Sequence, residues 1–236
     1  YPMTELSNEI KAALTHCEYE LKGQFMLGSN YTFLVDLRHE GETFPAVYKP
    51  GKGEQSLWDF PESTLALREV AAYQLSEALG FHIVPFTIYR SDGPYGPGSL
   101  QQYIDYDIEY HYFNFTPEDK QKIRPVVVFD ILANNADRKG SHVFFEDETR
   151  KLYAIDHGVC FHEEDKLRTV IWDFAGQNIP DDLLAPLSQT DDWSTIFGQY
   201  LSPKEVSALL TRAEILRTTR VFPHPFQGRR AYPYPP

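Results

Sequence analysis

Cysteine and methionine are scarce in this sequence, with two of each among 236 residues. The two cysteines, Cys17 and Cys160, lie far apart, and neither belongs to a Cys-x-x-Cys pair or to a cysteine–histidine spacing typical of zinc sites. The sequence therefore supports neither a structural zinc site nor a disulfide framework. We expect both thiols to be reduced in a cytoplasmic protein.

Long apolar runs and an excess of basic residues are also missing. No run reaches the ~18 apolar residues of a membrane-spanning helix, and the N-terminal residues lack the charged-then-apolar pattern of a secretion signal. Lysine and arginine number 22 against 34 aspartates and glutamates, a formal charge of -12 that repels nucleic-acid phosphates and anionic lipids. We therefore expect no nucleic-acid partner and no membrane partner.

The composition is that of a folded protein, with 42% hydrophobic residues, enough for one large core or two small ones. In the N-terminal part, alternating apolar residues and turn signals predict an antiparallel meander. One expected helix covers residues 3–15. A second covers residues 65–79, begins at Ser63 or Thr64 and stops at Gly80. The expected strands cover residues 20–26, 31–37, 44–48, 83–84 and 86–89.

Helical patterns dominate after a change near residues 100–105. The expected helices begin at Thr116-Pro117-Glu118 and continue with 123–133, 180–187, 192–200 and 203–218, and short strands are expected at 144–145 and 152–155. We therefore predict an α+β fold of two lobes. These are an antiparallel-sheet N-lobe of residues 1–102 and a mainly helical C-lobe of residues 103–222, followed by a proline- and aromatic-rich tail of residues 223–236.

Lys49 and Glu69 form the first candidate pair for chemistry. Phosphoryl transfer needs a cation on the nucleotide phosphates, an anion that holds this cation, a carboxylate for the metal and another for the acceptor. Lys49 ends a predicted strand, and Glu69 lies in the next predicted helix, where its carboxylate could reach the ammonium. Taken singly, such a lysine is more often a solvated strand end, and such a glutamate is more often an exposed helix charge.

The second candidate is a polar loop that follows the apolar helix 123–133. It carries Asp137, and reactive groups are often placed on such loops. Asp130, inside the helix, could hold the backbone of this loop. Farther on, a predicted strand ends in Asp156-His157-Gly158, which puts a carboxylate beside flexible backbone, a good position for a metal ligand. The alternative for the first loop is a turn rich in Asn and Asp.

Taken in order, these motifs resemble the atypical-kinase superfamily of phosphatidylinositol 3-/4-kinases, HipA-like kinases and secretory-pathway kinases. The resemblance is greatest to a bacterial group of small phosphatidylinositol-kinase-related proteins, and it implies a two-lobed protein-kinase-like fold. It covers roughly residues 20–160 and rests on Val47-Tyr48-Lys49-Pro50, Arg68-Glu69-Val70-Ala71-Ala72-Tyr73, Leu79-Gly80, Val84-Pro85, Asn135-Ala136-Asp137-Arg138 and Ile155-Asp156-His157-Gly158. Such a series in the right order is far more specific than any one motif.

The resemblance implies an ATP-binding phosphotransferase and assigns roles by position. Lys49 would contact the α- and β-phosphates and pair with Glu69, while the turn with Ser29 and Asn30 would cover the phosphates with backbone N–H groups. The adenine would meet a hinge between the lobes. That hinge consists of Gln101, Gln102 and Tyr103.

For the reaction itself, the resemblance implies that Asp137 orients the acceptor hydroxyl and that Lys139 neutralises the γ-phosphate. Asp156 would bind Mg²⁺ or Mn²⁺. His142 stands where most kinases carry an asparagine that binds a second metal, and imidazole suits Mn²⁺ better than Mg²⁺. The glycine content of the expected phosphate loop is also low.

These departures keep other functions open. The preferred function is an active kinase whose hydroxyl acceptor is a protein or a small polar molecule rather than a membrane lipid. A pseudokinase that binds nucleotide, or nothing, and serves as a scaffold would also account for His142 and for the missing glycine-rich loop. A nucleotidyl transferase on the same fold is a third possibility.

Overall fold

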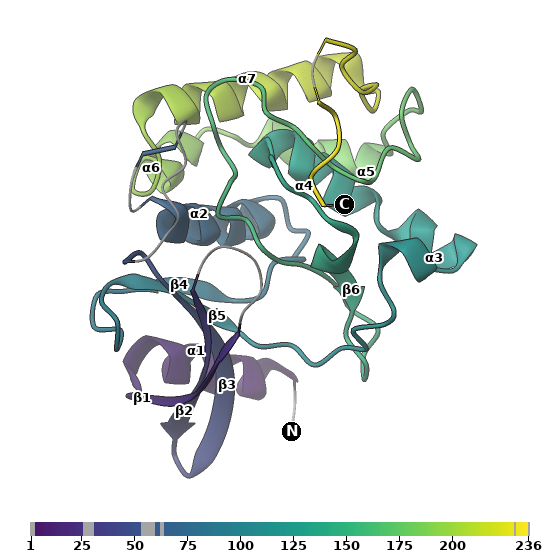
Figure 1. Cartoon of the computed structure of the whole chain (residues 1–236). Helices are drawn as coiled ribbons and strands as arrows, with labels where there is room; N and C mark the ends of the chain where they lie inside the picture. Colours follow the sequence, from purple (N-terminus) through teal and green to yellow (C-terminus); the bar gives the residue numbers. More distant parts are fainter. Residues whose placement is uncertain (1–2, 26–30, 53–59, 62–63, 229, 236) are drawn as a thin grey trace. The chain divides into compact units, whose positions relative to one another are not determined.

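The computed structural model describes residues 3–25, 31–52, 60–61, 64–228 and 230–235 (Figure 1). The chain forms two compact units. The sheet unit comprises residues 1–70 and 85–104, and the helical unit comprises residues 71–84 and 105–236. The expected division at residues 102 and 222 stays a prediction.

Five antiparallel strands form the centre of the sheet unit, in the order β1-β2-β3-β5-β4. Along β2, Phe33, Val35 and Leu37 are buried because every second side chain points to the same face. The expected meander is confirmed by the first three strands. The strands are β1 (Tyr19–Phe25), β2 (Thr32–His39), β3 (Glu42–Pro50), β4 (Thr87–Arg90) and β5 (Gly98–Gln102).

The N-terminal helix α1 (Met3–His16) packs on one face of this sheet (Figure 1). Ala13 and Leu14 of α1 join the apolar side chains of β2, β3 and β5 in one buried cluster. Arg90 at the end of β4 fixes the C-terminal end of the helix, because its guanidinium donates to the carbonyls of Leu14 and Cys17 and binds Asp92 through two hydrogen bonds.

Helix α2 (Leu65–Ala78) ends as its sequence predicts, at Gly80. Gly80 has a left-handed φ of 65°, its N–H bonds to the carbonyl of Glu77, and the N–H of Phe81 bonds to that of Ser76. This is the Schellman pattern that satisfies the last carbonyls of a helix.

The expected strand at residues 83–84 is wrong. The N–H groups of Ile83 and Val84 both donate to the hydroxyl of Ser76, at 2.8 and 3.1 Å. A side chain from α2 therefore takes the donors that a neighbouring strand would have needed, and only Thr87–Arg90 forms a strand in this region.

The helical unit is built around α4 (Arg124–Ala133) and α7 (Pro203–Thr219), which pack on each other (Figure 1). Phe129 and Leu132 of α4 and Leu209 of α7 are fully buried or nearly so. Helix α7 begins with a capping box formed by Ser202 and Glu205. The other elements are α3 (Pro117–Lys122), α5 (Asp181–Leu184), α6 (Trp193–Phe197), the hairpin β6 (Val143–Phe145) and β7 (Leu152–Ala154), and the single 3-10 turns η1 (Tyr112–Asn114), η2 (Gly140–His142) and η3 (Ala185–Ser188).

Within the described residues, none of the helices combines the length and the apolar character needed to cross a lipid bilayer.

Replacing Gly80 by alanine tests the stop of α2. A Cβ at Gly80 would meet no atom within 4 Å, so the cost is the left-handed backbone alone. We expect Gly80→Ala to lower the free energy of unfolding by ~1 kcal/mol in urea denaturation. Gly23→Ala is the matched control, because that glycine also has open space but no left-handed φ. Equal effects of the two substitutions would contradict this account.

Candidate active site

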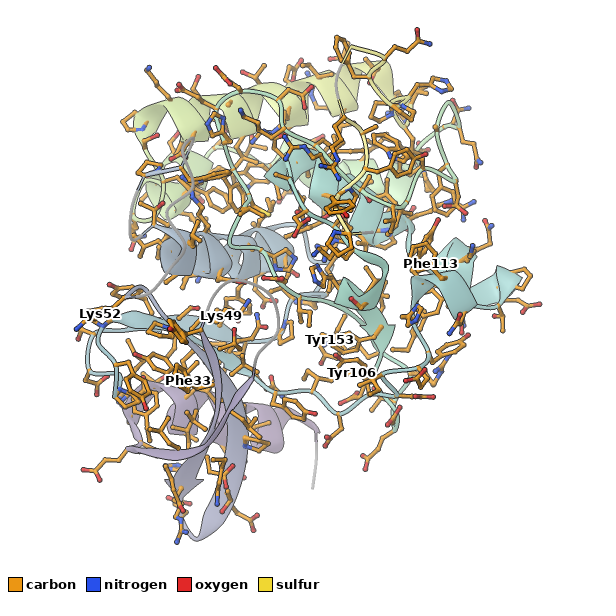
Figure 2. The ribbon with its side chains drawn as sticks, viewed as in Figure 1. Phe33, Lys49, Lys52, Tyr106, Phe113 and Tyr153 are labelled. Atoms are coloured by element: carbon orange, nitrogen blue, oxygen red, sulfur yellow. The ribbon has the colours of Figure 1, made fainter. Side chains whose placement is uncertain are left out.

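Lys49 and Glu69 form a close ion pair in the sheet unit. The Nζ atom of Lys49, near the end of β3, lies 2.5 Å from Oε1 of Glu69 on α2. The Glu69 side chain is only 3% exposed, so its charge needs a partner, whereas the Lys49 side chain keeps 24% of its surface. Figure 2 labels Lys49 among the side chains of this unit. The pairing expected from the sequence is present, and part of the Lys49 side chain remains exposed.

The strand that leads to Lys49 is held in place by its neighbour. Tyr48 is fully buried, and its hydroxyl donates to the carbonyl of Gly96. Pro50 pairs with Gly98 of β5, where an added Cβ would lie 2.3 Å from the carbonyl oxygen of Lys49. Only glycine allows this approach, so β5 fixes the direction in which Lys49 leaves the sheet.

The expected adenine hinge lies at the end of β5. The side-chain amide of Gln101 donates to the hydroxyl of Thr87 at 2.8 Å. The N–H groups of Gln102 and Tyr103 donate to the carbonyls of Phe86 and Pro45. Both backbone N–H groups are therefore already used in hydrogen bonds to the sheet unit. Ser29 and Asn30, the expected phosphate loop, fall outside the described residues.

In the helical unit, the loop with Asp137 begins where α4 ends. The amide of Asn135 donates its side-chain N–H to Asp130 at 3.1 Å, and its oxygen accepts the backbone N–H of Asp137 at 2.9 Å. Phe113, labelled in Figure 2, covers the other end of the loop, because a Cβ on Gly140 would lie 2.5 Å from its ring. The backbone on both sides of Asp137 is thus fixed by side chains.

Residues 159–170 run beside this loop and are bonded to it along their length. The side chain of Asn134 donates to the carbonyls of His162 and Glu164 and accepts the N–H of Lys166. Asn134 itself ends α4 with a left-handed φ of 52°. Backbone hydrogen bonds also join Val159 to Ala136, Phe161 to Ala133, Arg168 to Asn135 and Arg138, and Val170 to Arg138.

Asp137 has an environment that disfavours its charge. Burial is the main cause that raises its pKa from 3.8 to about 6; Lys139 opposes this shift, and the negative charge of Asp156 adds to it. The Nζ atom of Lys139 lies 3.6 Å from Oδ2 of Asp137, whose side chain is 35% exposed. A carboxylate with a pKa close to neutrality can take up a proton and still be reached by a substrate.

Asp156 and His142 lie together at the other side of the loop. Nε2 of His142 is 3.4 Å from Oδ2 of Asp156, and the N–H of Ile155 donates to the carbonyl of His142 at 3.0 Å. Asp156 has a left-handed φ of 64° and a half-exposed side chain. Such a conformation costs a residue with a Cβ on the order of 1 kcal/mol and often marks functional positions.

The structure thus brings Asp137, Lys139, His142 and Asp156 into one region of the helical unit, with Lys49 and Glu69 paired in the sheet unit. Nowhere in the part of the chain that the structure describes do three or more His, Cys, Asp or Glu side chains form a metal-binding group. Asp156 and His142 could supply part of a coordination shell. Phosphate oxygens and water would have to complete it, as is usual for Mg²⁺ on nucleotides.

Two arginines of this region were given no role by the sequence analysis, although Arg138 is part of one of its motifs. Arg168 contributes a positive charge near Asp137 and lowers the pKa of this carboxyl. Arg138 is fully buried and paired with Asp130. The sequence offers one signal for Arg138: it directly follows Asp137 and lies eight residues after Asp130, an aspartate in an apolar helix.

Comparison with known proteins gives one relative and one fold. No protein-family model matches the chain. Protein Rv2133c of Mycobacterium tuberculosis is 34% identical over 98% of this chain and 96% of that protein. The crystal structure of the proinflammatory kinase CtkA of Helicobacter pylori has a TM-score of 0.53 and 14% identity, over 87% of this chain and 93% of that one. At this identity the likeness shows the fold alone, and it confirms the expected α+β, kinase-like architecture.

The raised pKa of Asp137 can be measured directly. In a carbon-13 NMR titration, we expect the Asp137 carboxyl to titrate at a pKa of about 6. Asp156→Asn removes a nearby negative charge and should lower this pKa, whereas Lys139→Met removes a positive charge and should raise it. Titration near the ordinary value of 3.8 in the unaltered protein would contradict the burial described here.

Proposed function

The chain belongs to the family of Protein Rv2133c of Mycobacterium tuberculosis and has a kinase-like fold, and on this basis we propose that it transfers the γ-phosphate of ATP to a hydroxyl group. The proposal includes membership of the atypical-kinase superfamily of phosphatidylinositol 3-/4-kinase-like and HipA-like proteins, which the order of its motifs supports.

The observation that carries the proposal is the Lys49–Glu69 ion pair, with its 2.5 Å contact. Glu69 is buried and holds Lys49 near the end of β3, while 24% of the Lys49 side chain stays exposed. An ammonium held in this way is suited to bind the phosphates of a nucleotide. Asp137 and Asp156 supply the two carboxylates that the same chemistry requires.

In the proposed reaction, Lys49 binds the α- and β-phosphates and Lys139 the γ-phosphate. The acceptor oxygen forms a bond to the γ-phosphorus while the bond from this phosphorus to the β–γ bridging oxygen breaks. The acceptor proton passes to Asp137, and ADP leaves with the bridging oxygen. The raised pKa of Asp137 makes the carboxylate basic enough to hold that proton.

Asp156, with His142 beside it, is the proposed ligand of a Mg²⁺ or Mn²⁺ ion. The half-exposed carboxylate fits a hard divalent ion, and the imidazole 3.4 Å away favours Mn²⁺. When bound, the ion would neutralise negative charge on the phosphates. We propose a protein or a small polar molecule as the acceptor, since the formal charge of -12 disfavours an anionic membrane surface.

One observation favours a second candidate, a pseudokinase that binds nucleotide without turnover. His142 occupies the position expected for the second metal ligand, and its imidazole already contacts Asp156. If that contact persists when nucleotide binds, it would compete with the metal. The activity assay below separates the two candidates, and a product that carries a nucleotide instead of a phosphate would indicate nucleotidyl transfer.

The proposed function is tested with ATP labelled at the γ-phosphate. We expect metal-dependent ATP turnover or autophosphorylation, faster with Mn²⁺ than with Mg²⁺, and a loss of ~100-fold or more in Asp137→Asn. Asp191→Asn is the matched control, an exposed aspartate outside the site. A thermal shift with ATP but no turnover under any metal would overturn transfer and support the pseudokinase.

The rate should also depend on pH through Asp137. Its carboxylate must be ionised to accept the proton, and with a pKa of about 6 it becomes protonated as the pH falls below that value. We therefore expect kcat/KM to decline about tenfold per pH unit below pH ~6 and to level off above it. An acid limb near pH 4 would contradict the role given to Asp137.

A further inference from the structure

Arg138 is a buried cation whose hydrogen-bonding capacity is fully used. A guanidinium has five N–H donors and no acceptor. Nε and Nη2 bind the two oxygens of Asp130 at 2.9 Å each, and Nη2 also reaches Nε2 of His157 at 2.8 Å. Nη1 donates to the carbonyls of Ile155 at 2.8 Å and His142 at 3.3 Å. Each of the five N–H groups of Arg138 thus has an acceptor, and any other orientation of the guanidinium would lose some of these hydrogen bonds.

These bonds enclose Asp156 on both sides. One acceptor, the carbonyl of Ile155, comes directly before Asp156, and another, the ring of His157, comes directly after it. A third is the carbonyl of His142, whose imidazole contacts the carboxylate of Asp156. Arg138 is itself the chain neighbour of Asp137. One guanidinium therefore links the backbone of Asp137 to the flanks of Asp156.

The same geometry explains why residue 157 is a histidine. Arginine can only donate, so Nε2 of His157 must accept, and the ring carries its proton on Nδ1. The ring is fully buried and packs edge-on against Phe129 at 5.2 Å. Phenylalanine could make the aromatic contact but could not accept the hydrogen bond. Histidine at this position supplies both.

We infer that Arg138, with Asp130 and His157, is the positioning residue that sets the place of Asp156 relative to Asp137. The inference rests on the proposed function for its catalytic consequence. Burial lowers the pKa of Arg138, but the charge and hydrogen bonds of Asp130 more than offset this and raise it above its ordinary value, so the guanidinium stays charged. The left-handed Asp156 is held by bonds to the residues on either side of it.

Lysine in place of Arg138 keeps the positive charge and removes the planar guanidinium with its five N–H donors. With three donors on one nitrogen, it cannot bind Asp130 through two hydrogen bonds and also reach both carbonyls and His157. In Arg138→Lys we expect kcat to fall ~10–100-fold, with the KM for ATP changed less than about threefold. Amide hydrogen exchange of residues 136–142 and 154–158 should accelerate together, by roughly tenfold, while α7 keeps its protection.

Arg90→Lys is the matched control. Arg90 has the same pattern, with a two-bond contact to Asp92 and bonds to the carbonyls of Leu14 and Cys17, but it belongs to the sheet unit, whereas the four grouped site residues belong to the helical unit. Its replacement should lower stability and leave kcat unchanged. A folded Arg138→Lys protein with wild-type kcat and wild-type exchange would overturn the inference, and so would an equal loss of kcat in both variants.

If Arg138→Lys does not fold, His157→Phe and His157→Gln decide the question. Phenylalanine removes one acceptor and should lower kcat by about 3–10-fold and accelerate exchange at residues 154–158. Glutamine offers an oxygen near the former Nε2 and should restore most of both. Identical behaviour of the two variants would overturn the inference. An inactive wild-type protein would count against the proposed function alone, because the exchange comparison still measures the positioning.

Discussion

A charge removed from water must be compensated by groups of the protein, and here this requirement concerns Arg138. Its side chain is fully buried, and Asp130 binds it through two hydrogen bonds. Removing one partner of such a pair typically costs about 3–5 kcal/mol, because the other charge is left without compensation. The loop of Asp137, the end of β7 and the C-terminal half of α4 are therefore coupled through one side chain. A shift of any of them breaks bonds to the other two.

The sequence predicts much of the fold and the pairing of Lys49 with Glu69, for a physical reason. Strand alternation and the stop at Gly80 are local signals, and Lys49 and Glu69 could be paired because a strand end and the next helix are neighbours in the chain. Arg138 could not be found in this way. An arginine in a polar loop is typical of a solvated turn, and the acceptors that bury it come from residues 130, 142, 155 and 157. The expected strand at residues 83–84 failed for a similar reason, because one hydroxyl, that of Ser76, took its donors.

The two carboxylates of the site differ because their surroundings differ. Asp137 is partly enclosed, and burial raises its pKa, while Lys139 and Arg168 limit the rise. Asp156 is half exposed and stands beside an imidazole. Within one region of an acidic protein, two carboxyl groups thus have different surroundings, and the proposed roles of Asp137 as proton acceptor and Asp156 as metal ligand rest on this difference. The burial of each carboxyl group and its nearest positive group, rather than the number of carboxylates, produce this difference.

Residues 159–170 begin three positions after Asp156 and are bonded to the loop of Asp137 by four backbone hydrogen bonds and by the side chain of Asn134, and to the end of α4 by one more backbone bond. In enzymes that are switched on by ordering such a segment, a new phosphate supplies the missing contacts. In this chain the backbone and Asn134 already make such contacts, so the order of this segment rests on hydrogen bonds within the protein itself.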